Sequence, residues 1–291
     1  MTSPWSSSAS PSGISPEVHA PSLPLSFDWE DWWQLCLPGF SEASRFEDRL
    51  ARATDLALAL CEDLQAKGTW FCLVDQAQRH PELLRRIQAQ GHAIALHGLD
   101  HTRACDQERP AFLRWLEEGK ARLEDLCGAP VLGFRAPEWS LRGSADGFLE
   151  DVRASGFRYD SSRAPLAVLG DPGWPRQRHR RPDGLEVFPP PVVGKGAWSV
   201  PLWGWGMRTL PEAWLRRQLR LKAQAAAGTP LVIHPWELDE DQPDLPADVP
   251  FGHRWSHRAG LRGYGPRLRR MLTNFDLRPL EGFLDLGTLV P

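Results

Sequence analysis

The sequence predicts an α/β protein built on a parallel β-sheet. Short apolar runs of strand length alternate with longer amphipathic segments from Leu23 to about residue 235. Such regular alternation is typical of strand–helix–strand units, whose strands pair in parallel. Gly68 and Gly91 follow two of the amphipathic segments, and glycine readily adopts the left-handed conformation that ends a helix. Periodicity alone leaves open whether the sheet stays open or closes into a barrel.

The expected elements follow one another without an internal repeat. Strands are expected at the runs LPLSFD, TWFCLV, HAIALH, VLGFR, FRYD and PLVIHP. Helices are expected over residues 41–67, 81–90, 111–126, 144–154 and 212–227. Between residues 161 and 211 the text becomes rich in Pro, Gly and Trp, which predicts long loops with one or two short strands.

The two ends of the chain are expected to differ from its middle. Residues 1–20 are rich in Ser and Pro and offer almost nothing to bury, so we expect a disordered leader. Residues 21–240 are expected to form the main domain, and residues 241–291 a C-terminal extension packed on it. In that extension the basic, amphipathic run FGHRWSHRAGLRGYGPRLRRML is expected to form a closing helix, and His257 could approach a site from the preceding loop.

Composition excludes several classes of protein. A formal net charge of −3 with 24% charged residues gives no overall attraction to nucleic acid or to an anionic membrane. No apolar run is long enough to span a bilayer and no secretory signal is recognisable, so a cytoplasmic location is expected. The five cysteines show no CxxC spacing, which favours reduced thiols. Fourteen tryptophans against two tyrosines supply flat apolar surface for a core or for stacking on a sugar.

Polar side chains follow most of the predicted strands at the point where each strand ends. They are Asp28, Glu30 and Asp31 after the first strand, His97 and His101 after the third, Arg135 after the fourth, Tyr159 and Asp160 in the fifth, and His234 after the last. Because the carboxyl ends of parallel strands meet at one edge of a sheet, we expect a shared site there. Two imidazoles with one carboxylate can hold a divalent metal ion and leave positions open for water and substrate.

The third metal ligand is expected to be Glu30 or Asp31. Asp28 and Glu30 point to one face if the strand continues, whereas Asp31 joins them only if the chain turns. We therefore favour Glu30. Zinc is the expected ion, although histidine and carboxylate ligands also accept cobalt, nickel and manganese.

Six motifs occur in a recognisable order. They are SFDWEDWW, GTWFCLVDQAQRHPELLRRIQAQGHAIALHGLDH, GFRAPEWSL, FRYDSS, WGWGMRTLP and VIHPWELDEDQP. Over about residues 23–285 the chain thereby resembles the NodB-type polysaccharide deacetylases (carbohydrate esterase family 4), most closely the branch associated with exosortase and exopolysaccharide gene clusters. The resemblance implies a deformed (β/α)7-type barrel in a single domain. It departs from many members in the first motif, where two adjacent aspartates are usual, and at Gly98, where Ser or Thr is usual.

The resemblance also implies roles for individual residues. Asp28 would be the base that takes a proton from the attacking water, and His97 and His101 the histidine ligands. Arg135 would orient the base, and His234 would protonate the departing amine. The backbone N–H of Glu138 would fall where related enzymes stabilise the oxyanion.

The implied reaction is the removal of N-acetyl groups from an amino-sugar polymer or its lipid-linked precursor. The residues expected to border the substrate are Glu138, Trp139, Tyr159, Asp160, Trp205 and Trp236. Two alternatives remain: hydrolysis of another amide, such as a formylated sugar or a cyclic ureide, and a non-catalytic carbohydrate-binding protein. The complete set of base, acid and metal ligands argues against the second alternative.

Overall fold

A curled, nine-stranded sheet forms the centre of the protein in a computed structural model that describes residues 20–36, 45–141, 146–224 and 228–284. The strands are β1 (Ser22–Trp29), β2 (Thr69–Leu73), β3 (Ala93–Gly98), β4 (Gly133–Phe134), β5 (Tyr159–Asp160), β6 (His179–Arg180), β7 (Glu186–Val187), β10 (Leu231–Ile233) and β11 (Asp276–Arg278). Their order is β10-β1-β2-β3-β4-β5-β7-β6, and β11 also pairs with β1. Only the β6–β7 pair of this sheet is antiparallel. The expected deformed barrel is confirmed as a half-barrel, because β10 and β6 do not pair within the described residues.

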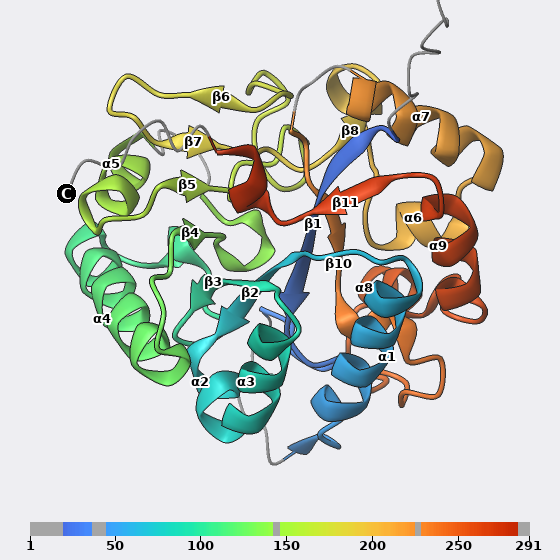
Figure 1. Ribbon diagram of the computed structural model, residues 1–291, viewed down its shortest axis with the longest axis horizontal. Helices are drawn as coiled ribbons and strands as arrows, with labels where there is room; N and C mark the ends of the chain where they lie inside the picture. The colour runs from blue at the N-terminus through green and yellow to red at the C-terminus, as the bar shows by residue number, and fades with distance from the viewer. Residues whose placement is uncertain (1–19, 37–44, 142–145, 225–227, 285–291) are drawn as a thin grey trace, which may run out of the picture.

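Helices surround the outer face of the curled sheet (Figure 1). They are α1 (Leu50–Asp63), α2 (Val74–Arg79), α3 (Pro81–Ala89), α4 (Arg109–Cys127), α5 (Asp146–Ala154), α6 (Trp205–Thr209), α7 (Glu212–Gln224), α8 (Phe251–Arg258) and α9 (Tyr264–Leu272). A two-stranded hairpin of β8 (Val192–Val193) and β9 (Val200–Pro201) lies in the loop-rich part of the chain. Apolar side chains of the helices and of the outer sheet face form one large buried core.

Alternation along β1 decides which side chains reach the inside of the curl. Leu25, Phe27 and Trp29 belong to the outer core. Ser26 and Asp28 face the other way and contact Arg135, which the curl encloses. Since successive side chains of a strand point to opposite faces, this alternation places a buried carboxylate inside the half-barrel.

Aromatic side chains close the inside of the curl at the end opposite the carboxyl ends of the strands. Phe71, Tyr159 and Phe188 pack together there with Leu280. The Tyr159 hydroxyl donates to the Glu281 carboxylate, and Glu281 also accepts from Thr69 at the start of β2. This packing gives the site above it a rigid, apolar floor.

The structure differs from the sequence expectations mainly at the C-terminal end. The basic run forms two helices, α8 and α9, where one was expected, and β11 then pairs with β1. The chain turns between the helices at Gly260, whose φ is +71° and where a Cβ would lie 2.7 Å from the Arg208 backbone. The short helix α2 was also not expected. The predicted leader falls on residues 1–19, which lie outside the described residues.

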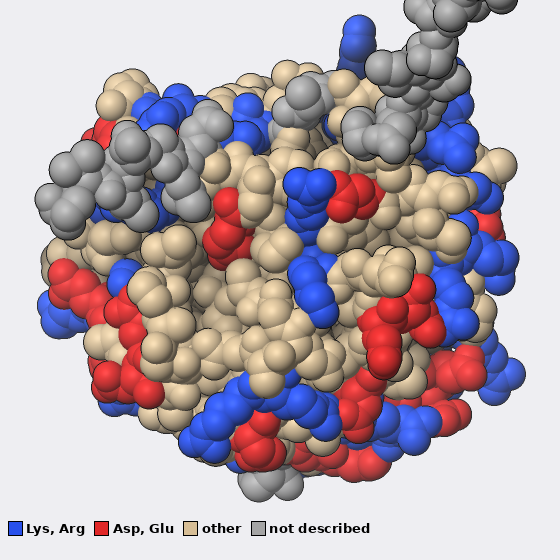
Figure 2. All heavy atoms as spheres, in the orientation of Figure 1, with Lys and Arg blue, Asp and Glu red and all other residues tan. Residues whose placement is uncertain are grey.

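Charge is evenly mixed on the face in Figure 2, where Lys and Arg side chains lie among Asp and Glu side chains around the edge. Such mixing gives little net field on that face. Within the described ranges, every helix is too short or too polar to cross a membrane.

Candidate active site

The side chains expected at the strand ends meet at one edge of the half-barrel. Asp28 comes from β1, His97 from β3, Arg135 directly follows β4, and His234 directly follows β10. Glu30 follows β1 after a tight turn in which its N–H donates to the Asp28 carbonyl at 3.1 Å. The parallel sheet therefore gathers residues that lie up to two hundred positions apart in the chain.

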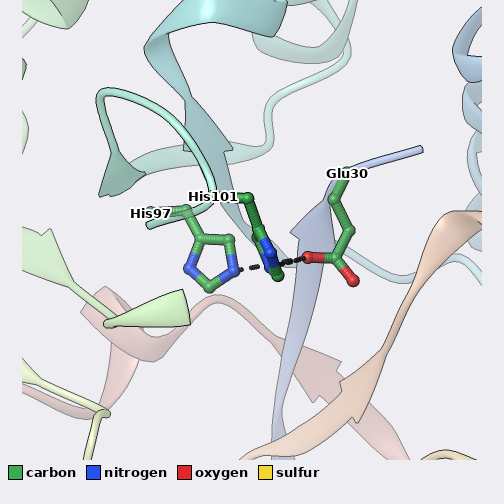
Figure 3. Close-up of side chains that lie close together, drawn as sticks. All are labelled: Glu30, His97 and His101. Atoms are coloured by element: carbon green, nitrogen blue, oxygen red, sulfur yellow. Dashed lines mark ion pairs between the residues drawn. The ribbon is translucent and has the colours of Figure 1, made fainter. Parts of the chain in front are cut away.

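Glu30, His97 and His101 point toward one another (Figure 3). One side-chain nitrogen or oxygen atom of each residue, of the kind that binds metal ions, lies within 4.8 Å of those of the other two. The Nε2 atoms of His101 and His97 are 2.7 Å and 3.6 Å from Glu30 Oε2. Ligand atoms around a tetrahedral zinc ion lie about 3.3 Å apart, given metal–ligand bonds of about 2.0–2.1 Å. Two nitrogens and one carboxylate oxygen at this spacing fit a divalent ion with an open position.

A contact at Nδ1 fixes the orientation of each imidazole of the cluster, in His97 and in His101. His97 Nδ1 donates to the Arg135 carbonyl at 2.7 Å, and His101 Nδ1 lies 3.3 Å from the Cys36 sulfur. The Cys36 thiol itself donates to the His101 carbonyl at 3.1 Å, so its sulfur is left to accept from Nδ1. These contacts fix both rings with their Nε2 atoms directed at Glu30, as the outer-shell partners of metal-binding histidines do. Cys36 was not expected from the sequence.

The electrostatics of the cluster prepare it for a cation. Burial opposes the charged form of Glu30, but the neighbouring His101 lowers the pKa of Glu30 well below its ordinary value. Burial likewise opposes the charge on His101, whereas Glu30 raises the pKa of His101 well above its ordinary value. A metal ion would take the place of the His101 proton between these groups, so metal affinity should fall as the pH is lowered.

Asp31 is not part of this cluster, although it was kept as a possible third ligand. Its carboxylate accepts from the Trp32 N–H at 2.8 Å, the Arg49 N–H at 3.0 Å and the Trp33 indole at 3.2 Å. Burial raises the pKa of Asp31 to about 6. The chain turns after β1, but Asp31 points into that turn and holds the loop together.

Asp28 is oriented by the buried guanidinium of Arg135. Arg135 Nη1 donates to Asp28 Oδ1, and its Nη2 donates to the Ser26 and Ser161 hydroxyls at 3.0 Å and 2.9 Å. The guanidinium also lies 4.0 Å above the Phe71 ring. Arg135 is 0% and Asp28 2% exposed. This fixed pair leaves Asp28 Oδ2 facing His234, whose Nε2 is 3.7 Å away.

His234 lies between two sets of charged side chains. The Asp28 and Glu30 carboxylates lie on one side of it, and the Glu237–Arg208 ion pair on the other. Its Nε2 is 3.8 Å from Glu30 Oε1, and its Nδ1 is 3.3 Å from Glu237 Oε2. Arg208 Nε in turn lies 3.1 Å from Glu237 Oε1. Burial would lower the pKa of His234, but the hydrogen bond and charge of Glu237, with the charges of Glu30 and Asp28, raise it to about 9. His234 is therefore cationic at neutral pH and able to donate a proton.

The turn after β4 carries two residues in the left-handed region. Glu138 and Trp139 have φ values of +51° and +50°. Such conformations cost about 1–3 kcal/mol each for non-glycine residues and gather at functional sites. The Glu138 carboxylate, expected to border the substrate, instead accepts from Arg103 Nε at 2.7 Å and from the Cys36 N–H at 3.2 Å. Glu138 therefore connects its own loop to the loops that carry Arg103 and Cys36.

Of the other residues expected to border the substrate, two lie at the site. The Trp236 indole N–H points at Glu30 Oε1, 3.4 Å away. The Trp139 ring lies 6.3 Å from the His234 ring and packs on Trp203. These two aromatic rings border the acid and the metal cluster.

The remaining three pack against other parts of the fold. Tyr159 is fully buried and reaches Glu281 at the far end of the half-barrel. Asp160, also fully buried, accepts from the Ser162 N–H at 2.9 Å and hydroxyl, and Ser162 Oγ accepts from the Ala136 N–H. Trp205 packs 5.9 Å from Trp255 of α8. Tyr159 and Asp160 are thus buried within the sheet and its loops, and their place beside a substrate stays a prediction.

His257 packs against Trp236, one of the aromatic residues that border the site. It lies within α8, not in the loop before it, and its Nε2 is 2.8 Å from the Trp32 carbonyl. Its ring stacks on Trp236 at 4.5 Å with an interplanar angle of 9°. Burial lowers the pKa of His257 to about 4. It is therefore a neutral support for Trp236.

An oriented carboxylate, a cationic imidazole and a cluster suited to a cation thus meet at the rim of the half-barrel, an arrangement chemically suited to metal-assisted hydrolysis. Comparison with known families agrees. Residues 39–159 match the polysaccharide deacetylase family model, and residues 161–285 match a domain of unknown function (DUF3473). Two successive parts of the chain are thus similar to two different family models, each over less than half of its length. The candidate site draws on both ranges, with His97 and Arg135 in the first and His234 in the second, while Asp28 and Glu30 precede residue 39.

Individual relatives agree with the expected enzyme class. The peptidoglycan-N-acetylglucosamine deacetylase of Bacillus cereus is 24% identical over 113 residues, which cover 39% of this chain and 41% of that protein. The chain therefore spans about two fifths of the length of this relative. A solved structure described as a polysaccharide deacetylase from Mycobacterium smegmatis has a TM-score of 0.62 at 20% identity, covering 92% of this chain and 90% of that one. The structure of PuuE allantoinase has a TM-score of 0.56 at 14% identity, covering 91% of this chain and 89% of that one. At these identities the two structures support the fold alone.

Proposed function

We propose that the protein is a metal-dependent deacetylase that hydrolyses the N-acetyl group of an amino sugar, in a polysaccharide or in its lipid-linked precursor. One observation carries the proposal. Asp28, fixed by Arg135, faces the cationic His234 at 3.7 Å beside the cluster of Glu30, His97 and His101. A base and an acid on either side of a cation site are what hydrolysis of an unactivated amide requires.

In the proposed reaction each side chain has a separate task. A zinc or similar divalent ion held by Glu30, His97 and His101 would polarise the acetamide carbonyl and make water a nucleophile at neutral pH. Asp28 Oδ2 accepts the proton of the attacking water. Arg135 keeps the Asp28 carboxylate in one orientation through Oδ1.

His234 completes the reaction at the leaving group. Its Nε2 gives a proton to the amide nitrogen, which leaves as the free amine of the sugar. Glu237 and Arg208 hold the imidazole from the other side. We also propose that the backbone N–H of Glu138 contributes to oxyanion binding, because the strained turn at Glu138 and Trp139 lies next to His234.

Acetate release from N-acetylglucosamine oligomers tests the proposal. The zinc-loaded protein is expected to release acetate and to produce free amino groups in equal amounts. N-formylated amino sugars and allantoin serve as competing substrates in parallel reactions. Turnover of one of these, without acetate release from any amino sugar, would overturn the deacetylase assignment and keep the hydrolase.

Replacing Glu237 with Gln is expected to move the alkaline limb of the kcat–pH profile to lower pH. His234 donates its proton only below its own pKa, and Glu237 is the main group that raises this pKa against the effect of burial. Glutamine keeps the shape without the charge, so the limb should move by about one pH unit or more.

Asp239→Asn is the matched control for Glu237→Gln. Asp239 lies on the same turn but pairs with Arg49 and Arg52 and does not contact His234 in the described structure. The kcat–pH profile of Asp239→Asn should have its alkaline limb at the same pH as that of the wild type. An unmoved limb in Glu237→Gln would show that Glu237 does not tune the acid.

Replacing Cys36 with Ala is expected to weaken zinc binding about 10- to 100-fold, the usual effect of losing an outer-shell partner of a metal ligand. The variant loses both contacts that hold His101. Cys36→Ser keeps a donor and an acceptor and should recover most of the affinity. Competition with a chelator measures the zinc Kd, and Cys105→Ala controls for the loss of a thiol. Equal affinities for the Ala variant and the wild type would refute this role.

A further inference from the structure

Helix α8 presents exposed aromatic side chains beside a hollow. Phe251 and Trp255 are 72% and 49% exposed. They are four residues apart, so they lie on the same face of the helix. A hollow of about 280 Å³ opens next to them, lined by Leu245, His257 and the polar side chains of Asp244, Arg254 and Arg258. Exposed aromatic patches with a polar rim typically mark binding surfaces.

This hollow shares a wall with the candidate active site. His257 lines it, and the His257 ring stacks on Trp236 at 4.5 Å. The Trp236 indole nitrogen in turn lies 3.4 Å from the Glu30 carboxylate. Two stacked rings therefore separate the hollow from the metal cluster. Trp205, 5.9 Å from Trp255, adds a further aromatic ring beside α8.

The rim of the hollow can hydrogen-bond to a hydroxyl-rich ligand. Arg258 Nε is paired with Asp244 at 3.2 Å, so a guanidinium and a carboxylate lie side by side there. Arg254 Nε is buried and has no hydrogen-bond partner among the described residues. Sugars present apolar C–H faces to aromatic rings and hydroxyl groups to guanidinium and carboxylate groups.

We propose that Phe251, Trp255 and the adjoining hollow form a glycan-binding subsite, which holds a sugar of the polymer beyond the one whose acetyl group is removed. This inference rests on the proposed function and deepens it, because it makes the substrate a chain of sugars. The subsite should contribute to binding of long oligomers and not of a single sugar.

Calorimetric titration of N-acetylglucosamine and of its hexamer tests the subsite. The protein is used with its metal removed, so that binding is measured without turnover. Trp255→Ala is expected to weaken hexamer binding about tenfold and to leave monomer binding unchanged. Phe251→Ala should act in the same direction. Trp198→Ala is the matched control, because Trp198 is 88% exposed on a different segment and should not alter either affinity.

The outcomes separate the subsite from the proposed function. Hexamer binding equal to wild type in both α8 variants, with acetate release intact, would overturn the subsite alone. Failure of the wild type to bind the hexamer more tightly than the monomer would also overturn the subsite, whereas the deacetylase proposal is overturned only by the absence of acetate release from the zinc-loaded protein. Vesicles containing anionic lipid are titrated in parallel. Vesicle binding that Trp255→Ala abolishes, with unchanged hexamer binding, would assign the patch to a membrane surface. Unchanged thermal unfolding confirms that each variant is folded.

Discussion

Asp28→Asn is expected to lower kcat for acetate release by about 10²- to 10⁴-fold, the usual contribution of a general base. Asparagine fills the same space and can still accept from Arg135, but it cannot take a proton from water. Because Asp28 lies outside the cluster of Glu30, His97 and His101, the variant should keep its metal. The measurement combines steady-state kinetics with elemental analysis of the purified protein.

Glu30→Gln is the matched comparison for Asp28→Asn. It changes a carboxylate two residues away that belongs to the cluster, so it should lose both metal and activity. Full activity in Asp28→Asn would exclude Asp28 as the base. Loss of metal in Asp28→Asn would place it among the ligands instead.

Arg135→Met is expected to destabilise the fold by about 3–5 kcal/mol, the usual cost of removing one partner of a buried ion pair. Arg135 and Asp28 are 0% and 2% exposed, so little water could replace the lost guanidinium at Asp28 Oδ1. Methionine is similar in length and keeps the contact with Phe71. Urea unfolding monitored by circular dichroism measures the change.

The double variant Asp28→Asn/Arg135→Met separates charge from packing. It removes both charges, so it should recover a large part of the lost stability while staying inactive. A loss below about 1 kcal/mol in Arg135→Met alone would contradict a buried, mutually dependent pair. A double variant no more stable than Arg135→Met would assign the loss to packing.

The edge of the sheet that carries the site could be predicted because each strand is recognisable from a short stretch of sequence. Alternating apolar runs identified the parallel strands, and the residue after each run then fell at a common edge. The period of two favoured Glu30 over Asp31 as the third ligand, and the structure groups Glu30 with the histidines, although Glu30 reaches them by a tight turn after β1 and not by a continued strand. The fold class followed from the same periodicity.

Other parts of the site could not be predicted because they depend on contacts between distant segments. Cys36 meets His101 across 65 positions, and no local pattern distinguishes its thiol from the other cysteines. Arg208 reaches Glu237 from a loop-rich region whose course no periodicity describes. Tyr159 lies within a predicted strand, but its hydrogen bond to Glu281 joins it to a segment far along the chain. The pairing of β11 with β1 is likewise set only by tertiary packing.

Titration of the metal-free protein with zinc tests the central claim most directly. Acetate release from N-acetylglucosamine oligomers should rise with added zinc and reach its plateau at about one equivalent. The double variant His97→Ala/His101→Ala, folded by circular dichroism, should bind no zinc tightly and release no acetate at any zinc concentration. Equal acetate release by the metal-free protein, or by the double variant, would contradict the proposed site.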